Sequence, residues 1–392
     1  MSNDRNDILY LARTNFRSTN TPFGIHQEDR FFHIHIIGKT GTGKTTLLET
    51  MLLQDINLGR GICLLDPHGD LVTKIKNSIP AHRLNDVVYM DITDPHQPYK
   101  YNPLKKAPFE SRAVIASSII EVFKKLWSDS RGWGVRLEHI LRYTLIALLD
   151  QPKADFSDIG RMLYDKSFRQ SALKNVISEE VKAFWIKEFP RYMYNDILPV
   201  LNKIGGMLAY PTIRRIVIDN KEEISLRKII DNRKIFLINL SKGIIGSDAC
   251  EILGSLLLTS LTSAAFSRAN IAEADRIPFF IYLDESQNFS TLSIVNMLSE
   301  LRKFKVGMIL AHQYTKQLEP SILDAVTGNV GTTISFRVDL PDATILAKKM
   351  FPVFDVTDFI NLPNYQIYLS LMIDGVPSKP FSAITSMTLK RP

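Results

Sequence analysis

The clearest indication of the fold is Gly38-Lys39-Thr40-Gly41-Thr42-Gly43-Lys44-Thr45-Thr46, which matches the pattern G-x-x-x-x-G-K-[ST] in full. An apolar run with β-branched and aromatic residues, Phe31–Ile37, comes directly before it, and helical spacing of apolar residues follows over Thr45–Asn57. A strand, a glycine-rich loop and a helix in this order form the P-loop, a phosphate-binding unit. The glycines let backbone N–H groups converge on phosphate oxygens, and the helix N-terminus adds its dipole.

This loop predicts a nucleotide site. We expect the residues from Gly38 to Thr46 to surround the phosphates, with Lys44 reaching the β- and γ-phosphates and the Thr45 hydroxyl ligating Mg²⁺. ATP and Mg²⁺ are therefore the predicted cofactors. The alternative is a glycine- and threonine-rich turn that matches the pattern by chance.

A second apolar strand, Ile277–Leu283, ends in two carboxylates, Asp284 and Glu285. We expect Asp284 to hold the Mg²⁺ shell and Glu285 to polarise the attacking water as a general base. A switch-type GTPase does not need this adjacent glutamate, whereas a hydrolysing motor does. The alternative is a solvated acidic turn after a strand.

Polar residues follow two further strands. Gln313 follows the strand Val306–Ala311. If that strand lies between the P-loop strand and the Asp284 strand, Gln313 lies beside the γ-phosphate and could sense hydrolysis.

Asp66 follows the strand Gly61–Leu65 and begins the sharp turn Asp-Pro-His-Gly-Asp. Two interpretations stay open for Asp66, which could orient Mg²⁺-bound water or cap the following helix.

Two arginines are candidates for contacting the transferred phosphoryl group. Arg302 comes before the strand Val306–Ala311, and ligands of a parallel sheet bind at the carboxyl ends of its strands. Arg302 is therefore expected at the opposite edge, where it could meet a phosphate only on a neighbouring subunit, as an arginine finger in trans. Arg337, at the carboxyl end of the strand Thr332–Arg337, could serve the nucleotide more directly. We rank Arg302 first and Arg337 second; a solvated or ion-paired arginine stays open for each.

Strand-like and helical runs alternate along the chain except in one block. From about 108 to 216 the apolar residues follow helical spacing, and this block carries 17 Lys/Arg against 12 Asp/Glu. We predict an α/β fold with a mostly parallel sheet, formed by 1–107 and 217–392, and an all-α insertion over 108–216. The expected strands are Phe31–Ile37, Gly61–Leu65, Val87–Met90, Lys234–Leu240, Pro278–Leu283, Val306–Ala311, Thr332–Arg337 and Gln366–Met372, with helices over 45–57, 247–266, 293–304, 320–327 and 342–350.

Composition excludes several classes of protein. With 392 residues, 45% hydrophobic and 23% charged, the chain has the proportions of a folded protein rather than a disordered or collagen-like one. The longest apolar run, Ile252–Phe266, is short for a bilayer and contains five Ser/Thr, so we predict a buried helix. The net charge of +7 suits a polyanionic partner without identifying one.

Histidine and cysteine indicate neither a structural metal nor a disulfide framework. His33 and His35 alternate along the P-loop strand and would share one face, but no Cys or third His completes a metal site, so we interpret them as a packed pair. Two cysteines, each in or beside an apolar run, fit a reducing compartment.

Taken together, these motifs resemble those of the HerA/FtsK superfamily of ATPases, and most closely the VirD/TraG/TraD-type coupling proteins of conjugation and type IV secretion. The resemblance runs from about residue 24 to the C-terminus. It is carried by the P-loop, the Asp66–Asp70 turn, Tyr282–Phe289, Leu301–Phe304 with Gln313 eleven residues beyond Arg302, and Gly328–Thr332 followed by Phe336-Arg337.

The resemblance implies a RecA-like motor core, a hexameric ring with ATP at subunit interfaces, and DNA driven through a central channel. The block 108–216 resembles the all-α domain that faces cargo in that family. Partners implied are DNA of either strandedness, a relaxase, and a secretion-channel or membrane-anchor protein. Coupling proteins usually start with transmembrane helices, whereas about 30 residues precede the P-loop strand here and none is expected to span a membrane.

Two interpretations of this departure stay open: an orphan member of the family that relies on a separate membrane partner, or a HerA-like DNA translocase that works with a nuclease. Two other functions also stay open, a nucleotide-gated cargo adaptor without processive movement and a motor for protein substrates. The expected location is the cytoplasm, peripheral to the inner membrane through a partner.

Overall fold

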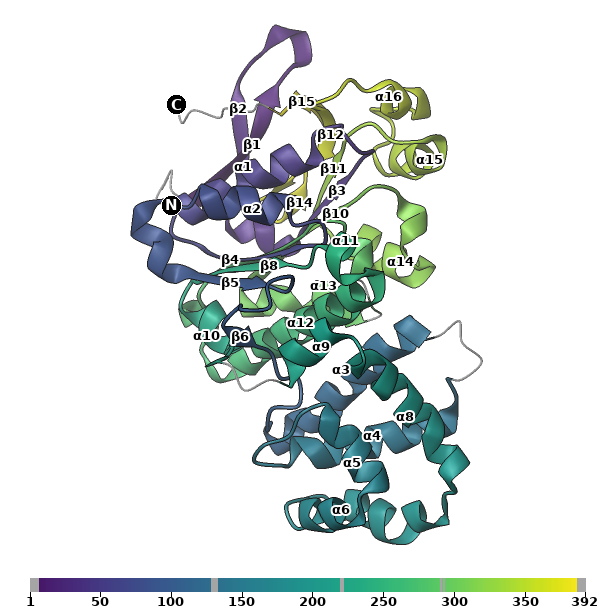
Figure 1. The fold of residues 1–392 in the computed structure, drawn as a ribbon. Coiled ribbons are helices and arrows are strands. Elements are labelled where there is room, and N and C mark those ends of the chain that lie inside the picture. The colour runs from purple at the N-terminus through teal and green to yellow at the C-terminus, as the bar shows by residue number, and fades with distance from the viewer. Residues whose placement is uncertain (1–6, 128–132, 219–221, 290, 292, 386–392) are drawn as a thin grey trace. The chain divides into compact units, whose positions relative to one another are not determined.

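The computed structural model describes residues 7–127, 133–218, 222–289, 291 and 293–385 (Figure 1). The chain forms two compact units. The first comprises Met1–Met90, Leu226–Leu240 and Ala264–Pro392, and the second comprises Asp91–Ser225 and Ser241–Ser263.

The first unit is built on an eleven-stranded sheet with the order β2-β1-β15-β12-β11-β3-β10-β9-β4-β8-β5. Its strands are β1 (Ile8–Thr14), β2 (Pro22–His26), β3 (Ile34–Ile37), β4 (Gly61–Asp66), β5 (Val87–Asp91), β8 (Ile235–Asn239), β9 (Phe279–Leu283), β10 (Val306–His312), β11 (Thr332–Ser335), β12 (Gln366–Ser370) and β15 (Phe381–Ile384).

The sheet is parallel in its centre and antiparallel at one end. The parallel part runs from β11 through β3, β10, β9 and β4 to β8, and all residues of these six strands are buried. Burial on both faces explains why these strands are continuous apolar runs rather than alternating ones. The strands β12, β15, β1 and β2 pair antiparallel. The predicted α/β fold with a mostly parallel sheet is confirmed; the strands β1, β2 and β15 were not predicted.

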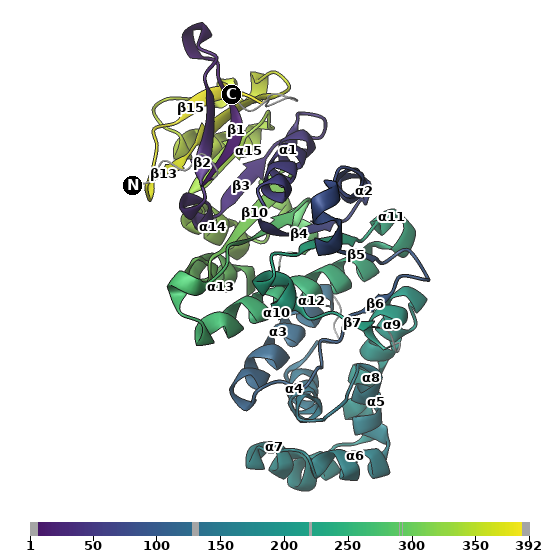
Figure 2. The same ribbon diagram turned by 90° about the vertical axis from the view of Figure 1, so that its left-hand side faces the viewer.

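Helices cover both faces of the sheet (Figure 2). On one face, α1 (Lys44–Asn57) and α2 (Asp70–Asn77) pack their apolar residues on alternate residues of the central strands. On the other face, α15 (Leu340–Lys349) and α16 (Val356–Asn361) enclose a smaller core around Ile37. The remaining α-helices that the structure describes in this unit are α10 (Leu226–Asp231), α13 (Ser293–Glu300) and α14 (Pro320–Asn329).

The segment before the P-loop departs from the prediction of one strand over Phe31–Ile37. Glu28–Phe32 forms a 3₁₀ turn, His33 has φ +66°, and the strand begins only at Ile34. His33 and His35 therefore do not share one face of a strand, so that interpretation is wrong. Both are nevertheless buried and packed: His33 Nδ1 accepts the backbone N–H of Met308 at 3.1 Å, and His35 stacks on His312.

A buried charged cluster fixes this 3₁₀ turn to α1 and β9. The Arg30 guanidinium donates two hydrogen bonds to the Asp55 carboxylate, at 2.7 and 2.6 Å, while Tyr282 Oη and Arg60 donate to the same carboxylate. Burial would raise the pKa of Asp55, but Arg30 and Arg60 lower it below the ordinary value of 3.8. The carboxylate is therefore ionised and fully paired inside the molecule.

The second unit is mainly helical. It contains the block 108–216 together with its flanking residues and Ser241–Ser263. Its elements are α3 (Phe109–Trp127), α4 (Val135–Leu149), α5 (Ser157–Tyr164), α6 (Lys166–Leu173), α7 (Glu179–Ala183), a π-helix (Phe184–Glu188), α8 (Tyr194–Leu208), α9 (Pro211–Val217), α11 (Lys242–Ile245), the larger part of α12 (Ser247–Phe266), β6 (Tyr99–Lys100) and β7 (Glu222–Glu223). An ion pair between the buried Arg112 and Asp150 joins the start of α3 to the end of α4.

One helix in the described part of the chain, Ser247–Asn270, is long and apolar enough to cross a membrane. Of its most apolar 18-residue window, 72% is buried inside the molecule. Burial of this extent is typical of a core helix, as predicted for Ile252–Phe266.

Candidate nucleotide site

The P-loop connects β3 to α1 and is held by the ends of the neighbouring strands. Gly38 N–H donates to the His312 carbonyl at 3.3 Å, and Lys39 N–H donates to the Arg337 carbonyl at 2.9 Å. The ends of β10 and β11 therefore fix the start of the loop, on either side of β3.

Two positions in the loop require glycine. Gly41 has φ +77° and Gly43 has φ +123°, conformations that L residues rarely adopt. A Cβ at Gly43 would also lie 3.0 Å from the rings of Phe336 and Tyr365, and one at Gly38 would lie 2.5 Å from Phe336 Cβ. These two aromatic residues thus form the wall against which the P-loop packs.

Lys44 points back into the loop. Its ammonium donates to the carbonyls of Gly38 and Lys39, the second at 3.2 Å, and the residue is only 6% exposed. Burial lowers the pKa of Lys44, and the nearby carboxylates of Glu285 and Asp284 act in the opposite direction. The lysine is thus placed between the phosphate-binding loop and the acidic end of β9.

The predicted carboxylates follow β9 directly. Asp284 N–H donates to the Leu65 carbonyl of β4 at 3.2 Å, and Glu285 has a left-handed backbone with φ +48°. Burial, Asp66 and Glu285 raise the pKa of Asp284 to about 7, and Lys44 only partly offsets this. A site in which carboxylates crowd together beside one lysine is chemically suited to a divalent cation.

Glu285 is held by two amide side chains. Gln287 Nε2 donates to one carboxylate oxygen at 2.7 Å, and Gln313 Nε2 donates to the other at 2.8 Å. The sheet order places β10 between β3 and β9, which is the condition under which Gln313 was predicted to lie beside the γ-phosphate. The structure therefore brings Lys44, Asp284, Glu285 and Gln313 to one edge.

Asp66 caps the following helix. Its two oxygens accept the backbone N–H groups of His68 at 2.8 Å and Val72 at 3.0 Å. Of the two interpretations left open by the sequence, this geometry supports the cap. The negative charge of Asp66 still acts on Asp284.

The residues present fit a nucleotide with Mg²⁺. Thr45 is exposed at the first turn of α1, and the carboxylate of Asp284 acts electrostatically on the neighbouring Lys44. In the described part of the chain, no group of three or more His, Cys, Asp or Glu could hold a metal by itself. Mg²⁺ bound here would therefore take its other ligands from phosphate and water, as it does in nucleotide sites.

The two candidate arginines lie at opposite edges of the sheet. Arg337 follows β11 at the P-loop edge, and its guanidinium donates to the Leu362 carbonyl at 3.3 Å and Asn364 Oδ1 at 2.8 Å. Arg302 lies in a 3₁₀ turn before β10, at the amino ends of the parallel strands. Its guanidinium is 3.7 Å from the centre of the Phe32 ring.

Behind the P-loop lies a buried pair of histidines. His35 and His312 stack with ring centres 4.6 Å apart and Nε2 atoms 3.3 Å apart. Burial lowers the pKa of both, to about 3 for His312, so the pair is neutral. Neutral rings support the strand ends without adding charge to the phosphate site.

Sequence reasoning did not assign roles to Phe336, Tyr365 and Gln287. Gln287 lies two residues after Glu285, and this closeness in sequence could have indicated that it contacts the Glu285 carboxylate. Phe336 directly precedes Arg337, but its contact with the P-loop depends on the pairing of β11 with β3. Tyr365 gives no such signal, because the hydrogen bond from its N–H to the Thr42 carbonyl joins residues over 300 positions apart.

Known proteins resemble this chain in sequence pattern and in fold. A family model described as the type IV secretion-system coupling protein DNA-binding domain matches residues 17–350. No curated protein matches the chain. The fold is similar to that of solved structures whose sequences are only 13% identical to this chain.

Three of these structures illustrate the similarity. The plasmid coupling protein TrwB with the GTP analogue GDPNP has a TM-score of 0.67, covering 97% of this chain and 91% of that one. TrwB with ADP and Mg²⁺ has a TM-score of 0.64, with 96% and 90% covered. VirB4 of Thermoanaerobacter pseudethanolicus has a TM-score of 0.63, with 97% and 96% covered. Because the family model matches most of this chain, the chain belongs to the type IV secretion-system coupling protein DNA-binding domain family.

Proposed function

We propose that this protein is an ATP-hydrolysing ring motor that translocates DNA and delivers cargo to a type IV secretion channel. The observation that carries the proposal is the placement of Glu285. It lies at the same sheet edge as Lys44 and Asp284, and its carboxylate is held by two amides. A glutamate oriented in this way beside a phosphate loop suits the activation of water.

Each residue of the site has a separate task in this proposal. The backbone from Gly38 to Thr46 binds the phosphates, and Lys44 leaves its loop carbonyls to contact the β- and γ-phosphates. Thr45 and Asp284 hold Mg²⁺, which when bound neutralises phosphate charge. Glu285 accepts the proton of the attacking water, and Gln313 responds to the presence of the γ-phosphate.

Nucleic acid is the proposed substrate to be moved. The family description names DNA binding, and the net charge of +7 favours a polyanion. Within this scheme the all-α insertion over 108–216 recruits cargo, and a relaxase, a secretion-channel protein or a membrane anchor is the partner. A HerA-like translocase paired with a nuclease would use the same site.

The proposed active form is a homo-oligomeric ring, most simply a hexamer. Arg302 lies at the edge of the sheet opposite its own P-loop, so it can reach only the nucleotide of a neighbour. An arginine finger supplied in trans is typically worth about 10³- to 10⁵-fold in phosphoryl transfer. Arg337, already bonded to Leu362 and Asn364, is the second choice.

The test is ATP hydrolysis measured without DNA, with single-stranded DNA and with double-stranded DNA, while the oligomeric state is followed by light scattering. The proposal expects DNA to stimulate hydrolysis in the assembled form and Lys44→Ala to abolish it. Hydrolysis that no DNA changes would favour a nucleotide-gated adaptor. Unchanged turnover in Lys44→Ala would remove the P-loop assignment altogether.

A further inference from the structure

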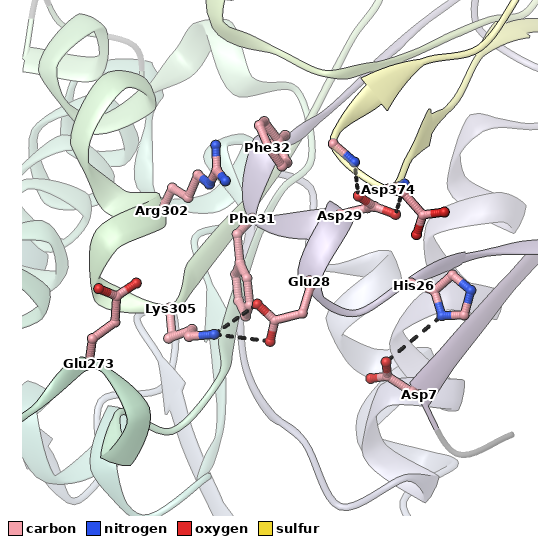
Figure 3. A pocket seen from close by; sticks show the side chains of 11 residues that line it. Asp7, His26, Glu28, Asp29, Phe31, Phe32, Glu273, Arg302, Lys305 and Asp374 are labelled. Carbon is pink, nitrogen blue, oxygen red and sulfur yellow. Dashed lines mark hydrogen bonds and ion pairs between the residues drawn. The ribbon is translucent and has the colours of Figure 1, made fainter. Parts of the chain in front are cut away.

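A cavity of about 550 Å³ opens at the amino edge of the sheet (Figure 3). We call it the amino-edge pocket; Arg302, Phe32, Asp29, Lys305 and Asp374 are among the residues that line it. It lies within the first unit, away from the carboxyl edge where the P-loop is found. The amino-edge pocket is therefore too far from the P-loop of its own subunit to take part in binding that subunit's nucleotide.

The two cations of the pocket are held differently. Lys305 Nζ is paired with the Glu28 carboxylate at 2.8 Å. Arg302 is exposed and, among the described residues, its guanidinium has no ion-pair or hydrogen-bond partner. It lies instead over the Phe32 ring, as Figure 3 shows. A cation on an aromatic face keeps its N–H donors free for another ligand.

Phe32 is itself fixed from two sides. The Phe32 carbonyl accepts the Gly331 N–H at 2.7 Å, and a Cβ at Gly331 would lie 2.7 Å from Phe32 Cβ. On the other side, Gly375 in the turn between β13 (Met372–Ile373) and β14 (Val376–Pro377) approaches the end of the ring. These contacts fix the backbone and Cβ of Phe32 and place the hairpin turn against the end of its ring.

The turn beside Phe32 is anchored by a buried carboxylate. Asp29, only 4% exposed, accepts the backbone N–H groups of Asp374 at 3.0 Å and Gly375 at 2.8 Å. Asp374 and Gly375 have φ +50° and +77°, the conformation that an Asp-Gly pair adopts readily in a two-residue hairpin. Asp29, the hairpin turn, Phe32 and Arg302 thus form one continuous chain of contacts.

We propose that Phe32 is the positioning residue for Arg302, holding its guanidinium over the ring so that its free N–H donors meet the γ-phosphate bound by a neighbouring subunit. This inference rests on the proposed function, in which Arg302 acts in trans. A flexible arginine loses side-chain entropy when it is ordered, and a fixed aromatic platform reduces that loss at the moment of reaction.

The expected effect is on hydrolysis and not on nucleotide affinity. Phe32→Leu removes the aromatic face and should lower kcat by about 5- to 30-fold, the equivalent of about 1 to 2 kcal/mol. Phe32→Tyr keeps the face and should stay close to wild type. Arg302→Ala should lose more, because the cation itself is gone. ATP affinity should be unchanged in all three, since their own P-loops are intact.

Mixed rings separate positioning from a general loss of structure. Phe32→Leu subunits mixed with Lys44→Ala subunits should regain activity, because the first supplies an intact P-loop and the second an intact Phe32–Arg302 pair. Phe32→Leu mixed with Arg302→Ala should regain none, because every interface lacks a well-placed finger. Phe31→Leu, which alters the buried ring stacked 5.8 Å from Phe280, is the packing control and should behave like wild type once folded.

The outcomes distinguish the two proposals. If Arg302→Ala hydrolyses ATP at the wild-type rate, the trans role fails and the positioning inference falls with it. If Arg302→Ala loses activity while Phe32→Leu keeps it, only the positioning inference is overturned. Failure of Phe32→Leu to recover with Lys44→Ala, or an equal loss in Phe31→Leu, would also overturn it by assigning Phe32 to general packing.

Discussion

Replacing Glu285 with glutamine should separate nucleotide binding from hydrolysis. The residue is 7% exposed, and both carboxylate oxygens accept amide N–H groups. Glutamine preserves the shape of the side chain and one hydrogen-bond acceptor. The folded state should therefore lose at most one hydrogen bond, which is worth about 1 kcal/mol of stability. The negative charge that we propose takes up the water proton is lost completely.

The expected decrease in kcat is about 10²- to 10⁴-fold, or about 2.7 to 5.4 kcal/mol of barrier. Because Lys44 and the loop backbone are unchanged, the Kd for ATP should stay within about threefold. The measurement is steady-state phosphate release together with equilibrium binding of a fluorescent ATP analogue. Glu300→Gln, the same change at an exposed carboxylate, is the matched control and should leave both values unchanged.

Two results would contradict the role of Glu285 as general base. A decrease in kcat of less than tenfold would show that Glu285 is not the base. A loss of ATP affinity as large as the loss of rate would show that Glu285 acts as a metal ligand or supports the fold instead.

Four further predictions concern Asp55, Gly43 and Gln313. Asp55→Asn leaves Arg30 without its charge partner and should lower the free energy of unfolding by about 3 to 5 kcal/mol in urea titrations. Since the folded-state pKa of Asp55 is lowered, its stabilisation is present above pH 3.8 and should disappear as the pH falls below that value, which acid titration of unfolding measures. Gly43→Ala, at φ +123° and against two aromatic rings, should weaken ATP binding at least tenfold by calorimetry. Gln313→Ala should slow phosphate release by about 10²- to 10³-fold while ATP affinity stays within about threefold.

The sequence was sufficient to place those residues that come directly after a parallel strand. The P-loop, Asp284 and Gln313 each follow an apolar run, and parallel strands bring their carboxyl ends to one edge. The sequence could not establish that Gln313 lies beside Glu285, because the order of the strands depends on pairing between distant segments. The structure supplies that order.

The segment before the P-loop shows what local pattern could not predict. Phe31–Ile37 has the composition of a strand, yet its first two residues belong to a 3₁₀ turn and the strand begins only at Ile34. The turn is stabilised by partners far along the chain, since Arg30 bonds Asp55 and Tyr282, and Phe32 lies under Arg302. Such contacts override local propensity and carry no signal in the neighbouring residues.

The antiparallel end of the sheet was missed for the same reason. β1 pairs with β15, so the first strand of the chain is completed by one near its other end. Its partner β2 pairs with a register shift between Tyr10 and Ala12, which breaks simple alternation. The positions of Arg302 and Arg337 at opposite edges, by contrast, followed correctly from their places before β10 and after β11.

The most direct test of the central claim is hydrolysis by mixtures of Lys44→Ala and Arg302→Ala subunits. Each variant alone should be nearly inactive, the first without a working P-loop and the second without a finger. In rings formed at random from equal amounts, about a quarter of the interfaces pair an intact P-loop with an intact Arg302. If Arg302 acts in trans, activity should peak near an equal ratio and vanish at either extreme. No recovery at any ratio, or full activity of Arg302→Ala alone, would contradict a trans arginine finger.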